Sequence, residues 1–395
     1  MLRATPRLAF RGPADMRRAM TDRPPSATDV LIVGAGIAGA SLAAALAPWR
    51  RVVLAEAENA PGYHATGRSA AFWHETYGGA RVQPLTLASL GALLDPDPEF
   101  SDHAFLSPRS ALTIGRTAEA AAVDAFAAEF GAKGVEIERL SGGAIAARVP
   151  GLRSEWSEAA YEGACRDIDV GGLHAAYLRA AKRAGAALVT RAPLRRARRA
   201  GDGWRVRLGE KEMDAAVIVN AAGAWADEVA AACGVAPLGI QPYRRTVLQV
   251  RLGVAVPAEL PLVIHVGGRF YFKGESVGRI WLSPHDETPA MAHDVAPEDM
   301  DVAIAIERLQ SVVDWPVAAV ERKWAGLRSF APDRIPVFGA DRDESRFVWC
   351  AGQGGFGIQT APAISALLAA QLGAPAPSGP IGRIDSLPFA PSRFA

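Results

Sequence analysis

Cysteine is scarce in this chain of 395 residues, which has only Cys165, Cys233 and Cys350, far apart along the sequence. Three cysteines without metal-ligand spacing exclude a disulfide framework and suit a reducing compartment, so we expect a cytoplasmic protein. The seven histidines form no HxxxH or HExxH pattern. We therefore expect no metal site.

An excess of charge of one sign is also absent. The formal net charge is +1, and half of the residues are hydrophobic. This balance gives no electrostatic reason to bind nucleic acid, so the expected partner is a small molecule. The dense basic stretch from Arg191 to Arg199 follows a strand-like segment and precedes a glycine turn, and we interpret it as a solvated sheet edge.

One uncharged run of 20 residues, Val30 to Trp49, is long enough to raise the question of a membrane span. Its glycines and its change from strand to helix argue against a continuous spanning helix, and a parallel strand buried on both faces is expected to be this apolar. We expect no integral membrane segment, with peripheral membrane association left open. Residues 1–28 contain six arginines, four prolines and no apolar signal-peptide core, which predicts a disordered extension.

The most informative stretch is Asp29 to Glu56. It reads as an apolar strand, the motif Gly34-x-Gly36-x-x-Gly39, an alanine-rich helix, a second strand and an acid. The glycines permit a tight turn, close approach to a pyrophosphate and close helix packing. The helix N-terminus attracts phosphate, and Glu56 is placed to bind a ribose. This pattern predicts an adenine-dinucleotide site.

The rest of the chain alternates between two kinds of segment, and its length exceeds the usual limit of one core, which predicts two domains. Residues 173–184 have helical periodicity and precede a strand at 187–190, while 204–208 and 213–219 look like a hairpin. From Gln241 to Leu282, short strands with aromatic residues (246–250, 269–273 and 279–282) predict an antiparallel sheet.

Near the C-terminus, a strand over 347–351 is followed by a second glycine-rich loop, Gly352 to Gly357, and a helix from about Thr360. Fewer than 40 residues remain after this loop, so it cannot open another complete nucleotide-binding unit. We expect it to serve the far end of the same cofactor. A helix N-terminus aimed at a flavin would stabilise negative charge on the reduced ring, which favours FAD over NAD.

Several stretches together resemble the D-amino acid oxidase superfamily of flavoproteins, and within it the bacterial FAD-dependent D-arginine dehydrogenases. They are the Gly34–Gly39 motif with Glu56, Gly62-Tyr-His-Ala-Thr-Gly-Arg-Ser-Ala-Ala71, Asn220-Ala-Ala-Gly-Ala-Trp225, Trp324-Ala-Gly-Leu-Arg-Ser-Phe330 and Gln353-Gly-Gly-Phe-Gly-Ile-Gln-Thr360. The resemblance implies a Rossmann-like α/β FAD-binding domain (29–105, 155–235 and 325–395) and an α+β substrate domain with an antiparallel sheet (106–154 and 236–324). It also implies hydride transfer from an amino-acid Cα to flavin N5, giving an imine that hydrolyses to a 2-oxo acid and ammonia.

The same resemblance implies a set of FAD-contacting residues along these stretches. They are Gly34, Gly36, Ala38, Gly39, Glu56, Ala57, Thr66, Gly67, Arg68, Ser69, Ala70, Ala71, Leu194, Ala222, Gly223, Trp225, Gly354, Gly355, Phe356, Gly357, Ile358, Gln359 and Thr360. Because the Trp324–Phe330 stretch has no cysteine, we expect the FAD to be bound non-covalently.

Substrate-binding residues are also implied. Arg245 and Arg328 match two carboxylate-binding arginines, and a guanidinium can grip a carboxylate with two parallel hydrogen bonds. Arg244 adjoins Arg245 and is the competing assignment. Tyr77 matches a lid tyrosine and Tyr271 a substrate-contacting tyrosine, while Gly355 and Gln359 match positions that meet substrate or flavin.

The chain departs from the D-arginine dehydrogenases at the substrate side chain. Phe72 and His74 stand where those enzymes have histidine and threonine, and Ser110 and Ala111 stand where they have a guanidinium-binding glutamate. A buried guanidinium without a partner is unfavourable, so neutral or apolar D-amino acids are expected instead. His74 could transfer a proton as a catalytic group or could be structural.

The expected function is therefore oxidative deamination of D-amino acids by an FAD-dependent dehydrogenase or oxidase, with Tyr77, His74 and Tyr271 as catalytic candidates. One alternative is oxidation of an N-methylated amino acid such as sarcosine, which the same arginines could anchor. A second is a flavin-bearing subunit of an electron-transfer assembly. The sequence leaves open whether oxygen or a quinone reoxidises the flavin.

Overall fold

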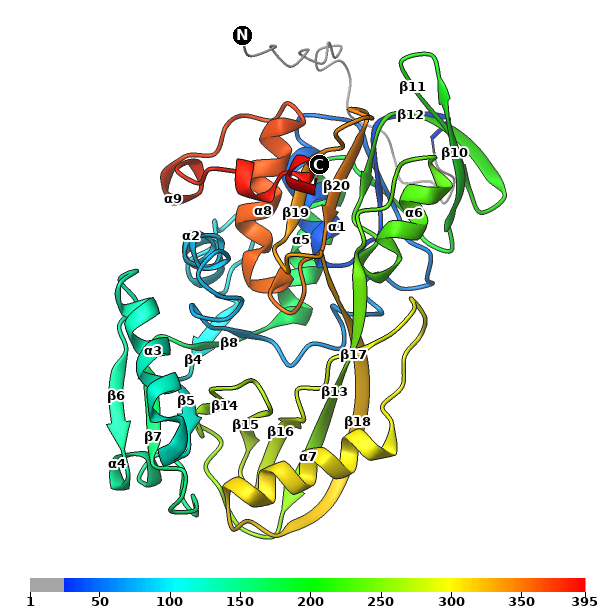
Figure 1. Cartoon of the computed structure of the whole chain (residues 1–395). Helices are drawn as coiled ribbons and strands as arrows, with labels where there is room; N and C mark the ends of the chain where they lie inside the picture. Colours follow the sequence, from blue (N-terminus) through cyan, green and yellow to red (C-terminus); the bar gives the residue numbers. More distant parts are fainter. Residues whose placement is uncertain (1–24, 395) are drawn as a thin grey trace.

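Two large β-sheets organise the protein, one in each of two lobes (Figure 1). The structure is a computed structural model that describes residues 25–394. The disordered extension expected over 1–28 lies mostly outside these residues. Strand β1 nevertheless begins at Ala27, so the expected boundary at Asp29 was late.

The first sheet has eight strands in the order β10-β11-β12-β1-β2-β9, with β20 beside the C-terminal part of β12 and β19 beside β20. Its centre is parallel, since β12, β2, β9 and β20 all run in the direction of β1. The strands are β1 (Ala27–Val33), β2 (Val52–Ala55), β9 (Ala187–Val189), β10 (Leu194–Ala200), β11 (Gly203–Leu208), β12 (Lys211–Asn220), β19 (Val337–Ala340) and β20 (Phe347–Ala351).

Alternate residues of β1 enter two different cores, as expected for a parallel strand buried on both faces. Val30 and Ile32 pack on one face, which α1 (Ile37–Leu46), α5 (Val170–Arg183) and α8 (Gly357–Gln371) cover. Leu31 and Val33 pack on the other face, toward α6 (Ala226–Ala232). This layered sheet confirms the Rossmann-like α/β fold that the first 30 described residues predict.

The second sheet has nine strands in the order β17-β13-β16-β15-β14-β5-β7-β6, with β18 on the other side of β13. It is antiparallel, as predicted, except where β14 pairs with β5 in parallel. The strands are β5 (Ala111–Gly115), β6 (Glu138–Ser141), β7 (Glu158–Glu162), β13 (Gln241–Leu252), β14 (Leu262–His265), β15 (Tyr271–Ser276), β16 (Arg279–Ser283), β17 (Thr288–Pro289) and β18 (Val317–Phe330).

Smaller elements cover and connect the two sheets. A three-stranded sheet joins β3 (Phe72–Trp73), β8 (Arg166–Ile168) and β4 (Leu106–Pro108). The remaining helices are α2 (Gln83–Leu94), α3 (Ala120–Gly131), α4 (Gly143–Ala146), α7 (Asp299–Val312) and α9 (Gly379–Gly382), with 3-10 turns at Thr117–Glu119, Gly223–Trp225, Leu387–Phe389 and Pro391–Phe394.

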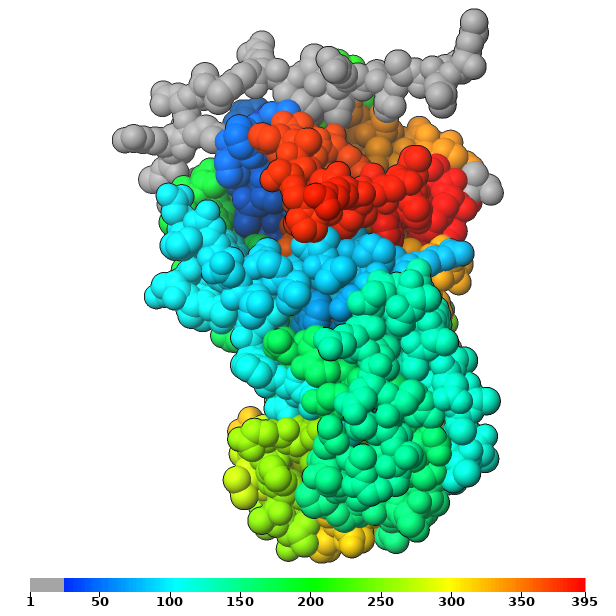
Figure 2. Space-filling view, turned by 90° about the vertical axis from the view of Figure 1, so that its left-hand side faces the viewer, coloured from blue at the N-terminus to red at the C-terminus, as the bar shows by residue number. Residues whose placement is uncertain are grey.

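The two lobes are joined by the long pair β13 and β18, which are hydrogen-bonded from Gln241↔Phe330 to Leu252↔Val317. Figure 1 shows both strands rising from the second sheet to the Rossmann-like lobe. Figure 2 shows the lower lobe from the side, where the teal segment that holds β5 to β7 lies beside the yellow-green segment that holds β14 to β16. Residues at the upper ends of β13 and β18 thus lie between the lobes.

Most predicted elements are confirmed, with shifts at their ends. The expected hairpin is β11 with β12, and β10 is an edge strand whose Arg195, Arg196 and Arg198 are exposed. The largest shift is at β13, which begins at Gln241 rather than Thr246. β15 begins at Tyr271 rather than Arg269, and α8 begins at Gly357 rather than near Thr360, so its first turn lies inside the glycine-rich loop.

Candidate cofactor and substrate site

The glycines of the first β–α turn stand where no side chain fits. Gly34 has φ +101°, and a Cβ there would lie 2.4 Å from the carbonyl oxygen of Ala221. A Cβ on Gly39 would lie 1.9 Å from the carbonyl oxygen of Gly34. α1 begins just after Gly36 and has no side-chain N-cap. The turn therefore offers backbone N–H groups to an anion.

Glu56 directly follows β2 beside this turn and is buried. Its Oε2 accepts the Ala35 N–H at 2.9 Å, and its Oε1 accepts the Glu58 N–H at 3.0 Å. These bonds fix the carboxylate against the glycine turn. Each oxygen keeps a lone pair that can accept a hydroxyl proton from a ligand.

A cavity of about 570 Å³ runs from Glu56 to the C-terminal glycine loop, well within the ~300–1,000 Å³ typical of ligand sites. The predicted cofactor residues that line it are Gly34, Gly36, Ala38, Glu56, Ala57, Thr66, Arg68, Ser69, Leu194, Ala222, Gly223, Trp225, Gly354, Gly355, Gly357 and Ile358. Gly39, Gly67, Ala70, Ala71, Phe356, Gln359 and Thr360 do not line it.

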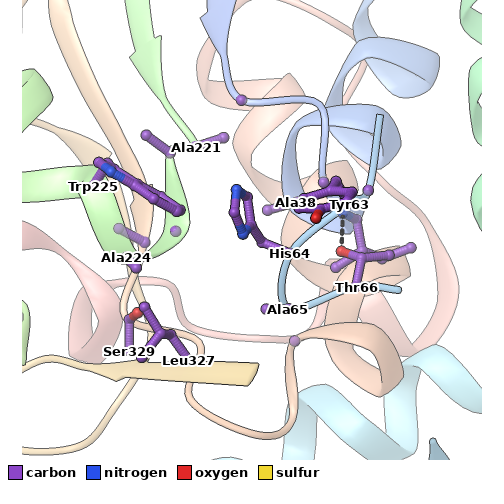
Figure 3. A pocket seen from close by; sticks show the side chains of 18 of the residues that line it. Ala38, Tyr63, His64, Ala65, Thr66, Ala221, Ala224, Trp225, Leu327 and Ser329 are labelled. Atoms are coloured by element: carbon purple, nitrogen blue, oxygen red, sulfur yellow. Dashed lines mark hydrogen bonds between the residues drawn. The ribbon is translucent and has the colours of Figure 1, made fainter. Parts of the chain in front are cut away.

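The middle of the cavity contains side chains that the sequence argument did not assign. Figure 3 shows His64 between Trp225 and Ala38. The Thr66 hydroxyl accepts the Ile37 N–H at 2.9 Å. The imidazole of His64 lies 4.5 Å from the Trp225 ring, centroid to centroid, and its Nε2 is 2.9 Å from Glu58 Oε1. His64 belongs to the quoted Gly62–Ala71 stretch, which could have drawn attention to it.

His174 was also missed, because nothing near it in the sequence marks it. It lies on α5, and its Nε2 is 2.9 Å from the carbonyl oxygen of Ala35. Burial lowers the pKa of His174, so the ring is neutral and donates its N–H to this carbonyl. This hydrogen bond thus ties the glycine turn to α5.

The C-terminal glycine loop closes the other end of the cavity. A Cβ on Gly355 would lie 2.2 Å from the Tyr77 hydroxyl and 2.9 Å from Arg328 Nη1. Gly354 has φ +52°, and a Cβ there would lie 2.2 Å from the Phe330 ring. The loop backbone therefore touches Tyr77, Arg328 and Phe330 directly, and only glycine permits this approach.

Two guanidinium groups adjoin this end of the cavity. Arg328 donates from Nη1 to the Tyr77 hydroxyl at 2.7 Å. Arg245 is buried, with Nε bonded to the Asp286 carbonyl at 2.8 Å and Nη2 to Glu287 Oε1 at 3.0 Å. Burial, and then the charge of Arg328, lower the pKa of Arg245 to about 10. Its Nη1 has no hydrogen-bond partner among the described residues, so the pair favours an anionic ligand.

The structure separates Arg245 from its neighbour. Arg244 forms ion pairs with Glu298 and, at 2.8 Å, with Asp301, and it does not line the cavity. Successive residues of a strand point to opposite faces, which explains the division. Arg245 is therefore the cavity arginine of β13.

Aromatic rings surround the two arginines. The Phe72 ring lies 5.3 Å from that of Tyr77 and 6.0 Å from that of Tyr271, and the Tyr271 hydroxyl has no partner among the described residues. His285, which the sequence argument missed, lies 5.7 Å from Tyr271 with φ +56°. Burial, and then Arg245 and Arg328, lower the pKa of His285 to about 2, so it is neutral.

Gln359 does not line the cavity and is therefore not placed to contact a ligand. Its side chain is buried, accepts the His74 N–H at 3.0 Å and donates to the Tyr77 carbonyl at 3.2 Å and to Thr86 Oγ1 at 2.9 Å. Its amide is thus occupied in holding the loop that carries Tyr77. Ser110, in the turn before β5, is half-buried and does not line the cavity.

The fold and the cavity define a dinucleotide-binding oxidoreductase, and comparison with known proteins makes the class specific. The family described as FAD dependent oxidoreductase matches residues 29–371, and the chain belongs to this family. FAD-dependent oxidoreductase domain-containing protein 1 of Bos taurus is 26% identical over 198 residues, which are 46% of this chain and 40% of that protein. The chain thus matches less than half the length of this relative.

Solved structures share the fold over nearly the whole chain. Glycine oxidase from Geobacillus kaustophilus has a TM-score of 0.80 and 22% identity, covering 93% of this chain and 99% of its own. L-proline dehydrogenase from P. horikoshii has a TM-score of 0.80 and 19% identity, covering 94% and 98%. Iminodiacetate oxidase from Chelativorans sp. BNC1 has a TM-score of 0.74 and 21% identity, covering 92% and 98%.

The cavity residues fit FAD, since a side chain at Gly34 or Gly355 would collide with its neighbours and Glu56 is fixed beside the first turn. The protein is thus an FAD-dependent oxidoreductase, as the sequence predicts. Over residues 25–394, no helix is long and apolar enough to cross a membrane. Within the same range, no group of three histidine, cysteine, aspartate or glutamate side chains could hold a metal ion.

Proposed function

We propose that the protein oxidises D-amino acids with neutral or apolar side chains to 2-oxo acids and ammonia. The observation that carries this proposal is the pair Arg245 and Arg328, which adjoins the cavity beside Gly355 and includes a buried Nη1 without a partner. A guanidinium pair of this kind suits a carboxylate. Bound FAD supplies the acceptor for the hydride that leaves Cα.

The FAD would extend along the cavity. Gly34, Gly36 and the N-terminus of α1 would hold its pyrophosphate, and Glu56 its ribose. The glycine loop at the start of α8 would meet the flavin ring, where the positive end of the helix favours the reduced anion. On this proposal residues 29–105, 155–235 and 325–395 form the FAD domain around the first sheet, and 106–154 and 236–324 form the substrate domain. The exception is β7 (Glu158–Glu162), which pairs with β5 and β6 in the second sheet and so goes with the substrate domain.

The preference for neutral side chains rests on the surroundings of the arginines. Phe72, Tyr77, Tyr271 and Ala111 offer aromatic and aliphatic surface, and burial of a substrate side chain against them contributes roughly 25 cal/mol per Å². The D configuration rests on the resemblance of the quoted motifs to D-arginine dehydrogenases. The solved relatives named for glycine, L-proline and iminodiacetate also support a substrate that pairs an amine with a carboxylate.

A second candidate is an N-substituted amino acid such as sarcosine. Two of the structural relatives are named for substrates that are secondary amines, L-proline and iminodiacetate. Arg245 and Arg328 would hold the carboxylate of such a substrate in the same way. The two candidates differ in their products, because oxidation of sarcosine releases formaldehyde whereas oxidation of a primary amino acid releases ammonia.

Anaerobic mixing of the purified holoenzyme with single D-amino acids, L-amino acids, sarcosine and iminodiacetate tests both candidates. We expect loss of the oxidised flavin absorbance with D-leucine or D-phenylalanine, and ammonia as the product. Bleaching by sarcosine alone would favour the second candidate. Absence of bleaching by all of these compounds would favour a flavin-bearing subunit and contradict the proposal. Reoxidation by oxygen or by a quinone analogue then identifies the electron acceptor.

A further inference from the structure

A buried carboxylate lies beside the aromatic cluster, on a strand that the sequence analysis did not connect with the site. Glu162 ends β7 and is directly opposite Ala111 of β5 in an antiparallel pair. Directly paired residues project to the same face of a sheet. Ala111 belongs to the apolar cluster of Phe72, Tyr271 and Leu262, so Glu162 faces the same space.

His74 is the basic side chain that contacts this carboxylate. Its Nε2 lies 3.2 Å from Glu162 Oε2, and both side chains are almost fully buried. Burial alone would raise the pKa of Glu162, but His74 and the Glu75 N–H outweigh it and the pKa is lowered. Glu162 is therefore ionised.

A second buried carboxylate nearby, that of Glu75, is hydrogen-bonded to a different side chain. Glu75 Oε1 accepts a hydrogen bond from Gln83 Nε2 at 2.6 Å. Burial, with a smaller contribution from the charge of Glu162, raises the pKa of Glu75, which favours its neutral form. His74 Nε2 lies near Glu162 Oε2 and also near Thr76 Oγ1, which is 3.2 Å away.

Phe72 contacts both this pair and the carboxylate-binding end. Its ring lies 6.4 Å from the His74 ring and 5.3 Å from the Tyr77 ring, and Tyr77 contacts Arg328. His74 Nδ1 has no hydrogen-bond partner among the described residues, whereas Glu162 Oε2 keeps its contact with His74 Nε2. Buried polar atoms without partners are rare and unfavourable, which marks this as a place for ligand recognition.

We propose that His74 is the counter-ion that masks Glu162, and that this pair, covered by Phe72, excludes substrates with basic side chains. Without His74 the carboxylate would become a receptor for an ammonium or guanidinium group, because an ionised buried carboxylate requires a cation. This inference rests on the proposed function, since it assigns the specificity of that same site. His74 would then determine specificity rather than transfer a proton.

The test compares kcat/KM for D-arginine and D-leucine in the holoenzyme. We expect the D-arginine to D-leucine ratio to rise at least about tenfold, equal to 1.4 kcal/mol, in His74→Asn or in Phe72→Ala/His74→Asn. Adding Glu162→Gln should abolish the gain, and His74→Lys, which keeps a cation, should retain the wild-type ratio. An unchanged ratio in both asparagine variants, or a gain that survives Glu162→Gln, overturns the proposal.

His265→Asn is the matched control. His265 is equally buried, on β14, and its Nε2 lies 3.1 Å from Glu119 Oε1, but it belongs with Val263 to the opposite face of the same sheet. Loss of this pair should affect stability without changing the substrate ratio. A comparable change of the ratio in the control would show that the effect is not specific to His74.

Thermal unfolding separates this inference from the proposed function. Millimolar agmatine, a guanidinium compound without a carboxylate, should raise the Tm of FAD-loaded Phe72→Ala/His74→Asn but not of the same variant with Glu162→Gln. The changes in Tm caused by substitutions at positions 74 and 162 should also be non-additive when the single variants are compared with the double variant. If no amino acid reduces the wild-type flavin, the proposed function fails. If the Tm effects of the two positions simply add and agmatine does not raise Tm, the proposal that His74 masks Glu162 is overturned.

Discussion

Arg328 on β18 and Tyr77, in the loop before α2, are joined by a hydrogen bond of 2.7 Å that crosses directly over Gly355. The three residues come from distant parts of the chain, and each is close enough to exclude a side chain on the glycine. The contact holds Arg328, Tyr77 and the loop at the start of α8 against one another. Four predictions follow from this site.

Glu56→Ala should weaken FAD binding about tenfold to a hundredfold, because it removes charge-assisted hydrogen bonds worth roughly 1.5–3 kcal/mol. Titration of the apoprotein with FAD, followed by flavin fluorescence, measures this. Wild-type affinity would contradict the ribose assignment. Acid precipitation should release free FAD, since burial raises the pKa of the cavity cysteine Cys350 to about 12 and keeps it as an unreactive thiol.

Arg328→Ala and Arg245→Ala should each raise the KM for the amino acid, because a desolvated carboxylate without a partner costs about 2–5 kcal/mol. FAD content should remain normal, and lysine should rescue only in part because it lacks the planar fork. Arg244→Ala is the matched control, since its partners are Glu298 and Asp301. It should lower Tm while leaving KM nearly unchanged. Wild-type KM in both cavity variants would show that the arginines do not bind substrate.

Gln359→Ala should lower the free energy of unfolding by about 1–3 kcal/mol and raise KM, because buried groups of His74 and Tyr77 lose their partner. Thermal unfolding and steady-state kinetics together check this. Gln353→Ala provides the comparison, since within residues 25–394 the Gln353 amide donates only to Cys350 Sγ, at 3.5 Å. Equal effects in the two variants would argue against a clamp on the Tyr77 loop.

Stability should fall as the pH is lowered below about 6.5. His285 has a folded pKa of about 2 against an ordinary value of 6.5, so its contribution is complete above 6.5 and is lost as the pH falls toward 2. One such group changes the free energy of unfolding by at most about 1.4 kcal/mol per pH unit. His174 and His265, whose pKa values are also lowered, act in the same direction.

His285→Asn, which tolerates the left-handed backbone at this position, should flatten the pH dependence of Tm between neutral pH and pH 5. An unchanged dependence would mean that His285 is protonated in the folded protein. The same pKa bears on the site, because a His285 that stays neutral beside Arg245 and Arg328 adds no positive charge to their cationic field. Substrate KM should therefore change little between pH 6 and pH 8 through this residue.

The sequence by itself determined the dinucleotide-binding half of the protein. The Gly34–Gly39 motif, the flanking strands and Glu56 lie within one continuous stretch, so local spacing was enough to predict their turn, their parallel pairing and an adenine-dinucleotide site. The choice of FAD over NAD came from the C-terminal glycine loop. The antiparallel second sheet was predicted for the same reason, because alternation and aromatic content are local signals. Element ends such as Gly357 were missed because a glycine-rich helix start resembles a loop in sequence.

Only the tertiary structure decided which side chains meet. The choice between Arg244 and Arg245 depended on which face of β13 turns to the cavity, and the local sequence does not show this. His174, His285 and Glu162 were missed because their roles arise from contacts across elements, where burial and nearby charges set protonation. Cross-strand register brought Glu162 beside Ala111, and such register is fixed by the packing of the whole sheet rather than by any short motif.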